Sequence, residues 1–427
     1  MSRALIARCA GLLLLVLFAA VARAGDALLL QHARVLAPAG DSWRDDQDVA
    51  LDGGKIVAIG PSGSIDARIA ADLRRIDLHG QRLVPGLIDL HTHLLLHPYD
   101  ETPWDEQVTK ESLEARTIRA TAAARATLAA GFTTIRELGT EGAGFADVAL
   151  RDAIAHGVIP GPRIFAATRA IVAEGCYGPR GFDPRIEIPQ GAEEVNGADS
   201  ARGAARRQIA AGADWIKLYA DYRRGTGAVS SPTLTLEEMR AAVDEAKRAG
   251  LKAVAHATTD AGIRAAIDAG VATIEHGTGA SDATLALMRD RGVVLCPTLA
   301  ASEAVARYRG WKPGDPEPER IAESRELMRR ALASGVTIAC GSDAGVFAHG
   351  TNAREIELMV AYGMTPKDAL AAATRVAATV LGRADLGTID VGRTADLVAL
   401  DGDPLTDPPA LHRVTLVVKD GHVAPRE

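Results

Sequence analysis

The sequence has few aromatic residues and no excess of positive charge, and both features limit the classes of protein to which it can belong. Phe, Trp and Tyr make up 4% of the 427 residues, whereas Gly occurs 42 times, which suits helices packed closely on a sheet. The 48 Lys and Arg residues are outnumbered by 55 Asp and Glu, so we expect no nucleic-acid partner. With 47% hydrophobic residues, the chain has enough apolar material for a large core.

Cysteine is also scarce, and its spacing fits neither a disulfide framework nor a metal-binding pair. Cys9 lies in the N-terminal segment, which leaves Cys176, Cys296 and Cys340 at wide intervals. In an oxidising compartment, one disulfide bond between two of these three cysteines remains an alternative. The simpler interpretation is three small core residues.

The N-terminal segment predicts export. Arg3 and Arg8 precede an apolar run from Gly11 to Val21, and Ala22-Arg23-Ala24 supplies the small residues of a cleavage site. The run is too short to span a bilayer, so residues 1–24 read as a signal peptide. We therefore expect a secreted or periplasmic protein with no membrane attachment after cleavage.

Two terminal regions have the texture of short β-strands and turns. They cover residues 25–84 and 385–427, and neither alone offers enough strands for a stable sheet. We expect them to combine into one small β-sandwich domain. Residues 85–384 would then form the second domain.

In residues 85–384, β-type runs alternate with Ala-rich helical patterns, which indicates an α/β protein with a (β/α)₈ (TIM) barrel. The expected strands are Leu87–Leu94, Thr133–Gly139, Arg163–Arg169, Asp214–Ala220, Lys252–Ala257, Thr273–Gly277, Val293–Leu299 and Thr337–Gly345. The expected helices include Lys110–Ala130, Ala201–Ala211, Thr235–Ala249 and Pro366–Leu381. The Gly/Pro-rich segment Gly175–Asn196 reads as a loop over the barrel mouth.

Ionisable residues fall near the C-terminal ends of these strands, where barrel enzymes place their chemistry. His91-Thr92-His93 puts two imidazoles on one face of a strand, which favours metal chelation. A buried lysine is costly without a partner or a modification. The remaining residues of this pattern are Lys217, His256, His276 and Asp343.

These motifs resemble the amidohydrolase superfamily, and most closely its imidazolonepropionase-like branch with Xaa-Pro and Xaa-Arg dipeptidases. The resemblance covers nearly all of the chain after residue 24. The matching motifs are Pro85-Gly86-Leu87-Ile88-Asp89-Leu90-His91-Thr92-His93, Trp215-Ile216-Lys217, Ala255-His256-Ala257, Glu275-His276-Gly277, Gly341-Ser342-Asp343-Ala344-Gly345 and the tail from Gly387 to Val398.

The resemblance implies a site with two divalent metal ions. His91, His93 and Asp343 would hold one ion, and His256 and His276 the other. Lys217, carboxylated by CO₂, would bridge them, which removes the cost of a buried cation. Zinc is the expected metal, although the ligand types also suit Mn²⁺ and Co²⁺. A metal-bridging hydroxide would attack the amide carbonyl, with Asp343 as general base and then acid.

The expected substrate is a dipeptide or an N-acyl amino acid, from which a C-terminal amino acid is released. Ochratoxin A, an aryl-amide of phenylalanine, has the same carboxylate and amide, and exported relatives include hydrolases of that type. An arginine should hold the carboxylate. The candidates for this role are Arg136, Arg169, Arg180, Arg223 and Arg224, and the aromatic candidates for substrate contact are Tyr177, Tyr219 and Tyr222, each of which is equally well read as a packing residue.

Two departures from relatives leave the substrate preference open. Gly175-Cys176-Tyr177 lacks the histidine found after strand three in many relatives, and Thr258 replaces a His or Tyr. A cyclic-amide hydrolase is the alternative enzyme, but such enzymes often lack the bridging lysine. A binding protein that has lost the chemistry is a further alternative, which the complete ligand set disfavours.

Asp89 is either a partner of the metal ligands or a polar residue of the barrel floor. Oligomers are common in the superfamily.

Overall fold

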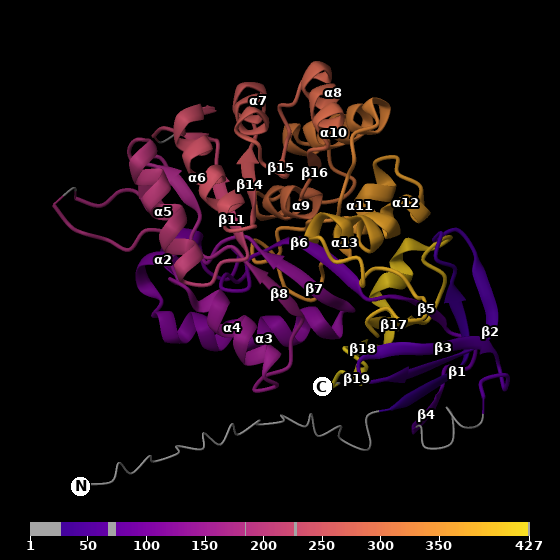
Figure 1. Cartoon of the computed structure of the whole chain (residues 1–427). Helices are drawn as coiled ribbons and strands as arrows, with labels where there is room; N and C mark the ends of the chain where they lie inside the picture. Colours follow the sequence, from indigo (N-terminus) through magenta and orange to yellow (C-terminus); the bar gives the residue numbers. More distant parts are fainter. Residues whose placement is uncertain (1–26, 67–73, 184, 226–228, 426–427) are drawn as a thin grey trace, which may run out of the picture.

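The computed structural model describes residues 27–66, 74–183, 185–225 and 229–425 (Figure 1). The expected signal peptide, residues 1–24, lies outside the described residues. Within the described ranges, no helix combines the length and the apolar character needed to cross a membrane.

Parallel strands run through the middle of the chain and carry most of the candidate site residues. One sheet contains three strands, β6 (Leu87–Thr92), β7 (Phe132–Glu137) and β8 (Arg163–Ala166). A second sheet has the order β10-β9-β11-β14-β15-β16. Its strands are β9 (Ile171–Ala173), β10 (Glu193–Val195), β11 (Trp215–Tyr219), β14 (Lys252–Ala257), β15 (Thr273–His276) and β16 (Val294–Cys296).

The pairing of these strands does not close into the complete eight-stranded barrel that the sequence predicts. In the described structure, Thr337–Gly345 forms no continuous strand and is joined by isolated bridges, Leu295 to Ile338 and Thr92 to Ala344. The segment is irregular because Asp343 has a φ of 64° and Gly345 a φ of 116°. A Cβ at Gly345 would lie 2.5 Å from the carbonyl oxygen of His93, so only glycine fits there. The bridges nevertheless place this segment between β16 and β6.

Helices surround the parallel strands (Figure 1). Their bounds are α2 Trp104–Lys110, α3 Leu113–Ala129, α4 Ala146–Ala155, α5 Ala198–Ala210, α6 Leu236–Arg248, α7 Asp260–Ala269, α8 Asp282–Arg291, α9 Leu299–Tyr308, α10 Glu319–Ser334, α11 Arg354–Ala361, α12 Pro366–Ala372 and α13 Arg375–Leu381. The expected capping box is present at the start of α6, where Thr235 accepts from the Glu238 backbone and Glu238 accepts from that of Thr235.

The helix expected over Pro366–Leu381 is instead two helices, α12 and α13. Thr374 has φ −135° and ψ −100°, which no helix tolerates. Gly387 packs against this break, and a Cβ there would lie 2.7 Å from the carbonyl carbon of Thr374. The close approach of the returning chain therefore interrupts a segment whose composition alone favours one helix.

The terminal regions share one eight-stranded sheet, with the order β19-β18-β17-β5-β1-β2-β3 and β4 paired to β1. The strands are β1 (Leu28–Leu36), β2 (Trp43–Asp52), β3 (Lys55–Pro61), β4 (Arg74–Asp77), β5 (Arg82–Pro85), β17 (Leu397–Leu400), β18 (Val414–Lys419) and β19 (His422–Val423). β17 lies between β5 and β18 and is antiparallel to both. A sandwich of two facing sheets is not confirmed, because these strands belong to a single sheet.

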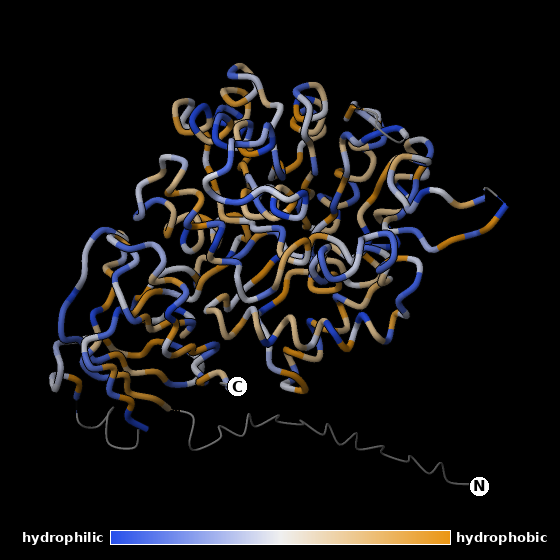
Figure 2. Tube along the Cα trace, turned by 180° about the vertical axis from the view of Figure 1, so that it is seen from behind, coloured by the Kyte–Doolittle hydropathy of each residue, from blue (hydrophilic) through white to orange (hydrophobic). Residues whose placement is uncertain are grey.

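An ion pair joins the terminal sheet to the parallel strands. Arg163 at the start of β8 donates to Asp396 over 2.7 Å and also pairs with Asp420. Asp396 directly precedes β17, and Asp420 directly follows β18. Figure 2 shows hydrophobic residues concentrated along the inner strands and hydrophilic residues on many outer turns. The sheet has its own buried cluster, which includes Leu30, Val49 and Leu397.

Candidate metal centre and active site

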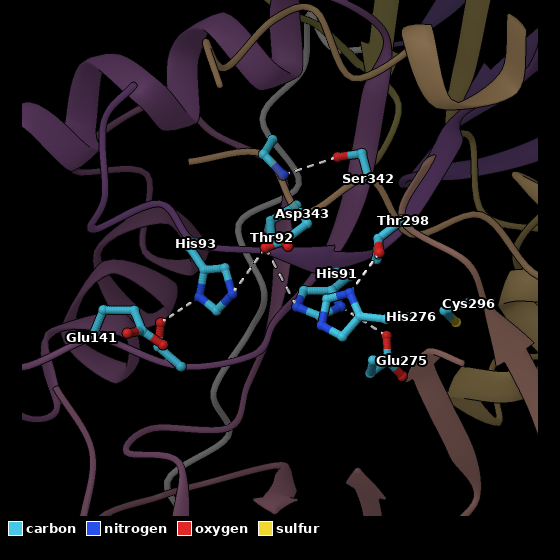
Figure 3. Close-up of polar contacts among 12 residues, drawn as sticks. His91, Thr92, His93, Glu141, Glu275, His276, Cys296, Thr298, Ser342 and Asp343 are labelled. Atoms are coloured by element: carbon cyan, nitrogen blue, oxygen red, sulfur yellow. Dashed lines mark hydrogen bonds and ion pairs between the residues drawn. The ribbon is translucent and has the colours of Figure 1, made fainter. Parts of the chain in front are cut away.

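His91 and His93 present their Nε2 atoms to Asp343, as Figure 3 shows. The distances from Asp343 Oδ1 are 3.6 Å to His91 Nε2 and 3.3 Å to His93 Nε2. On the far side of the rings, Glu275 accepts from His91 Nδ1 over 2.8 Å, and the carbonyl of Gly139 accepts from His93 Nδ1 over 2.8 Å. Because Nδ1 is the donor in each ring, Nε2 offers a lone pair to a metal ion once it carries no proton.

This trio is the one group of described residues whose ligand atoms all lie within 4.8 Å of one another. His93 also shows that the site stabilises positive charge. Burial lowers the pKa of its imidazole, but the hydrogen bond and charge of Asp343 outweigh burial and raise the pKa to about 9. Conversely, burial raises the pKa of Asp343, and the His93 interaction overrides it, so the pKa is lowered. The arrangement favours a cation between the carboxylate and the rings.

His256 and His276 come from the ends of β14 and β15. Ring centroids are 4.6 Å apart between these two residues and 5.4 Å apart between His276 and His91. His276 Nδ1 lies 2.6 Å from Thr298 Oγ1, which leaves Nε2 as the available atom. Burial lowers the pKa of both imidazoles well below the usual value, so both are neutral and suited to metal binding.

Lys217 in β11 is 1% exposed, and no hydrogen bond or ion pair to another described residue engages its Nζ. Its nearest ring contact is Tyr219, whose centroid is 5.4 Å from Nζ. Burial lowers the pKa of Lys217 to about 8. Lys217, His256 and His276 thus lie on the neighbouring parallel strands β11, β14 and β15, while Asp343 lies beside His91 and His93.

Backbone strain coincides with these side chains. His276, Thr298 and Asp343 have φ values of 69°, 51° and 64°, in the left-handed region that non-glycine residues rarely adopt. Such strain costs on the order of 1–3 kcal/mol per residue and is concentrated at functional sites. It is maintained here by the contacts that orient the His276 ring and the Asp343 carboxylate.

Two polar residues predicted from the sequence prove to be structural supports. Arg136, a candidate for binding the substrate carboxylate, is 0% exposed and donates to Glu275 over 2.9 Å and to the Leu90 carbonyl over 2.7 Å. Its guanidinium is thus committed inside the protein, so Arg136 is withdrawn as a substrate contact. Asp89 accepts from the Ser342 and Asn352 side chains and from the His91 backbone. It fastens β6 to segment 337–345 and does not orient an imidazole.

The aromatic candidates cluster beside the metal ligands. Tyr219 stacks on His256 with centroids 4.5 Å apart, and Tyr177 lies 4.8 Å from Tyr219 and 4.9 Å from Tyr222. Arg180 donates to the carbonyls of Cys176 and Arg223. Arg223 is exposed, with its guanidinium 5.7 Å from the Tyr222 ring.

Sequence reasoning missed several residues around the centre. Glu275 was quoted only as part of a motif, although it pairs with both His91 and Arg136. Glu141 is 2% exposed and accepts from Tyr177 over 2.5 Å and from Trp104 over 2.9 Å. The position of Glu275 next to His276 was the available signal, whereas nothing marked Glu141. The three cysteines of the described residues are free and buried, as the simpler interpretation predicts.

The chain matches the model of the amidohydrolase family over residues 82–424. It is 30% identical to ochratoxinase of Aspergillus niger over 365 residues, which cover 76% of this chain and 71% of the relative. It is 26% identical to imidazolonepropionase of Salinispora tropica, with 83% and 86% covered. A solved Xaa-Pro dipeptidase with bound methionine matches with a TM-score of 0.80 and 33% identity over 93% of this chain and 99% of the other.

The donor set, the fold and these similarities agree. Two imidazoles and a carboxylate come together beside the parallel strands, and the relatives with printed activities are hydrolases. The chain therefore belongs to the amidohydrolase family and is a hydrolytic enzyme with the α/β fold of that family.

Proposed function

We propose that the protein hydrolyses the amide bond of a dipeptide or an N-acyl amino acid and releases the C-terminal amino acid. The observation that carries this proposal is Asp343, whose Oδ1 faces the Nε2 atoms of His91 and His93. Similarity to a Xaa-Pro dipeptidase and to ochratoxinase supports a substrate with an amide next to a carboxylate-bearing residue.

We further propose a site for two divalent ions, most suitably Zn²⁺. His91, His93 and Asp343 would hold one ion, His256 and His276 the other, and a carbamate on Lys217 would bridge them. The fit rests on rings with free ring nitrogens and on a buried lysine without a hydrogen-bond partner in the described structure. When bound, such ions lower the pKa of water and polarise a carbonyl oxygen.

The residues of the chain then supply positioning and proton transfer. Asp343 accepts the proton of the attacking water and delivers it to the nitrogen of the departing amine. Glu275 and the Gly139 carbonyl hold the first histidine pair in the tautomer that leaves Nε2 free. We propose that the hydroxyl of Tyr219, whose ring stacks on His256, donates to the substrate carbonyl or carboxylate.

A cyclic-amide hydrolase is the second candidate, because imidazolonepropionase is among the relatives. The two functions are separated by a hydrolysis screen of the zinc-reconstituted protein against Xaa-Phe, Xaa-Leu, Xaa-Pro and Xaa-Arg dipeptides, N-acyl amino acids including ochratoxin A, and lactams. We expect free amino acid from the carboxylate-bearing amides, with Asp343→Asn as the inactive control. Lactam opening alone would establish the cyclic-amide reading.

Export and assembly complete the proposal. Residues 1–24 would direct the chain out of the cytoplasm and be removed after Ala24. Expression of the full chain with N-terminal sequencing of the exported product tests this point, and a product that still begins at Met1 contradicts it. Homo-oligomers are expected by analogy with the superfamily, and light scattering of the mature protein measures the assembly.

A further inference from the structure

The carboxylate of Glu141 is buried beside the metal-ligand candidates, and only one of its two oxygens is engaged. Glu141 is 2% exposed, and Tyr177 and Trp104 both donate to Oε2, over 2.5 Å and 2.9 Å. The other oxygen, Oε1, is buried and has no hydrogen-bond partner among the described residues. A buried anionic acceptor without a donor is costly, so this position favours a donor that the chain itself does not supply.

The unpartnered oxygen approaches the first pair of histidines. A Cβ at Gly139 would lie 3.4 Å from Glu141 Oε1 and 3.6 Å from His93 Cε1, which are ordinary contact distances. Because glycine has no side chain, there is room for one non-hydrogen atom between the carboxylate and the imidazole. Figure 3 shows Glu141 next to the His93 ring. Oε1 therefore borders the proposed metal site.

The backbone around Glu141 holds the carboxylate in this place. Its φ is 49°, in the left-handed region that non-glycine residues rarely adopt, and strain of this kind is concentrated at functional sites. Arg116 is buried and donates to the backbone carbonyls of Thr140 and Glu141. Its other hydrogen bonds go to the Leu95 carbonyl. The charge of Arg116 attracts that of Glu141, but in the described chain its N–H groups serve the backbone and not the carboxylate.

An ammonium group is the donor that suits this position best. A positively charged donor supplies both the missing hydrogen bond and an attraction to the carboxylate, and burial strengthens that attraction. Trp104 and Tyr177, with ring centroids 5.0 Å apart, hold the carboxylate from its other side. In a dipeptide, one carbon separates the N-terminal ammonium from the scissile carbonyl. A carbonyl at the metal site thus carries the ammonium to the border of that site.

We propose that Glu141 binds the N-terminal ammonium of the substrate, so that the protein prefers free dipeptides to N-acyl amino acids. This inference rests on the proposed amide hydrolysis and narrows its substrate class. The ammonium reaches Oε1 from the His93 side, where Gly139 has no side chain, and donates to it. An N-acyl group carries no charged donor and leaves Oε1 without a partner.

The test compares Ala-Xaa dipeptides with propionyl-Xaa on the zinc-loaded full chain, where Xaa is whichever of Phe, Leu, Pro or Arg the hydrolysis screen shows to be released. The two compounds differ only in the amino group, which is protonated at pH 7. For the wild type we expect kcat/KM to be about 10–100-fold higher for the dipeptide, the gain from a charge-assisted hydrogen bond. Glu141→Gln should lose most of this preference through a loss on the dipeptide alone, and Glu141→Asp should keep part of it.

Two further variants separate the charge of Glu141 from its support of the neighbouring rings. Tyr177→Phe removes a donor to Oε2 but keeps the carboxylate, so the preference for the dipeptide should persist. Asp105→Asn is the matched control, because it removes an exposed carboxylate beside Trp104 and should leave the preference unchanged. Zinc content and melting temperature should match the wild type in Glu141→Gln and in the control.

Each contrary result has a distinct meaning. A wild type that cleaves propionyl-Xaa as well as Ala-Xaa overturns the ammonium subsite and leaves the proposed function standing. An equal loss on both compounds in Glu141→Gln also overturns the subsite, because a purely structural role would affect both. A wild type that cleaves no carboxylate-bearing amide of the screen overturns the proposed function as well.

Discussion

The Glu275 carboxylate joins a buried arginine to a metal-ligand candidate: Oε2 accepts from His91 Nδ1 over 2.8 Å, and Oε1 accepts from Arg136 over 2.9 Å. All three side chains are almost fully buried. Thr273 adds a hydrogen bond of 2.5 Å to Oε1. The hydrogen bond with Glu275 thus fixes the orientation of the His91 ring, and the negative charge of Glu275 balances the positive charge of Arg136.

Replacing Glu275 should weaken both the metal site and the fold. In Glu275→Gln the His91 ring loses an anionic acceptor and Arg136 is left as an unpaired buried charge. We expect metal affinity to fall about 10–100-fold and the free energy of unfolding to fall by about 3–5 kcal/mol. Zinc titration against a chelator and denaturant unfolding measure the two effects. Glu326→Gln, which removes an exposed pair, should change neither.

Asp343→Asn should separate metal binding from catalysis. The amide keeps an oxygen ligand but cannot accept a proton, so we expect zinc to be retained and kcat to fall about 10²–10⁴-fold. Zinc analysis and steady-state kinetics test this. Asp290→Asn, an exposed carboxylate of α8, serves as the control. Unchanged turnover in Asp343→Asn would remove the residue from proton transfer.

Lys217→Ala should lose at least one of two bound ions and most activity, because the other ligands would lack their bridging anion. A carbamate on Lys217 also predicts a carbonyl signal in the ¹³C NMR spectrum after reconstitution with ¹³C-bicarbonate, which the variant should lack. Lys252, at the start of β14, is the control lysine, and Lys252→Ala should keep both ions. Full metal content in Lys217→Ala contradicts the bridging role.

Stability should decline as the pH rises from about 4.5 to 8 because of Glu355. Burial raises the pKa of its carboxyl from 4.5 to about 8, and one of its oxygens has no hydrogen-bond partner in the described structure. The folded protein therefore holds this proton more tightly than the unfolded chain. The resulting stabilisation is complete below pH 4.5, decreases as the pH rises, and is lost above pH 8, by on the order of 5 kcal/mol.

Glu355→Gln should flatten this pH dependence, since glutamine does not titrate. The measurement is the free energy of unfolding of the zinc-loaded protein between pH 5 and pH 8.5. Glu326→Gln should keep the wild-type slope, because the ion pair with Arg329 lowers the pKa of Glu326 and that group is ionised throughout the range. Parallel slopes for the wild type and Glu355→Gln would contradict the assignment.

Local signals in the sequence identified the ligand set better than its supports. His91 and His93 share a face because strand side chains alternate, and His256 and His276 fall at strand ends. Arg136 and Glu275, in contrast, lie far apart in the sequence, and no local pattern reports their pairing. Arg136 was one of five arginine candidates for the substrate carboxylate, and its burial against Glu275 could not be predicted because the sequence does not show this long-range contact.

The last parallel strand was the least predictable element of the fold. Thr337–Gly345 contains β-favouring residues, but the left-handed backbone at Asp343 prevents a regular ladder. That conformation depends on contacts with β6, including the hydrogen bond from the Asp343 backbone to the His91 carbonyl. Tertiary contacts of this kind also split the helix expected over Pro366–Leu381, where Gly387 approaches Thr374.

The placement of β17 between β5 and β18 has a consequence for biosynthesis. The N-terminal strands leave the ribosome first. The edge of β5 that pairs with β17 therefore stays unpaired until the whole parallel-strand region has been translated. Until then, one edge of the nascent sheet is open to pairing with other chains. A nonsense mutation or proteolytic cut before Leu397 would make that exposure permanent, so such fragments should aggregate even when every metal ligand is present.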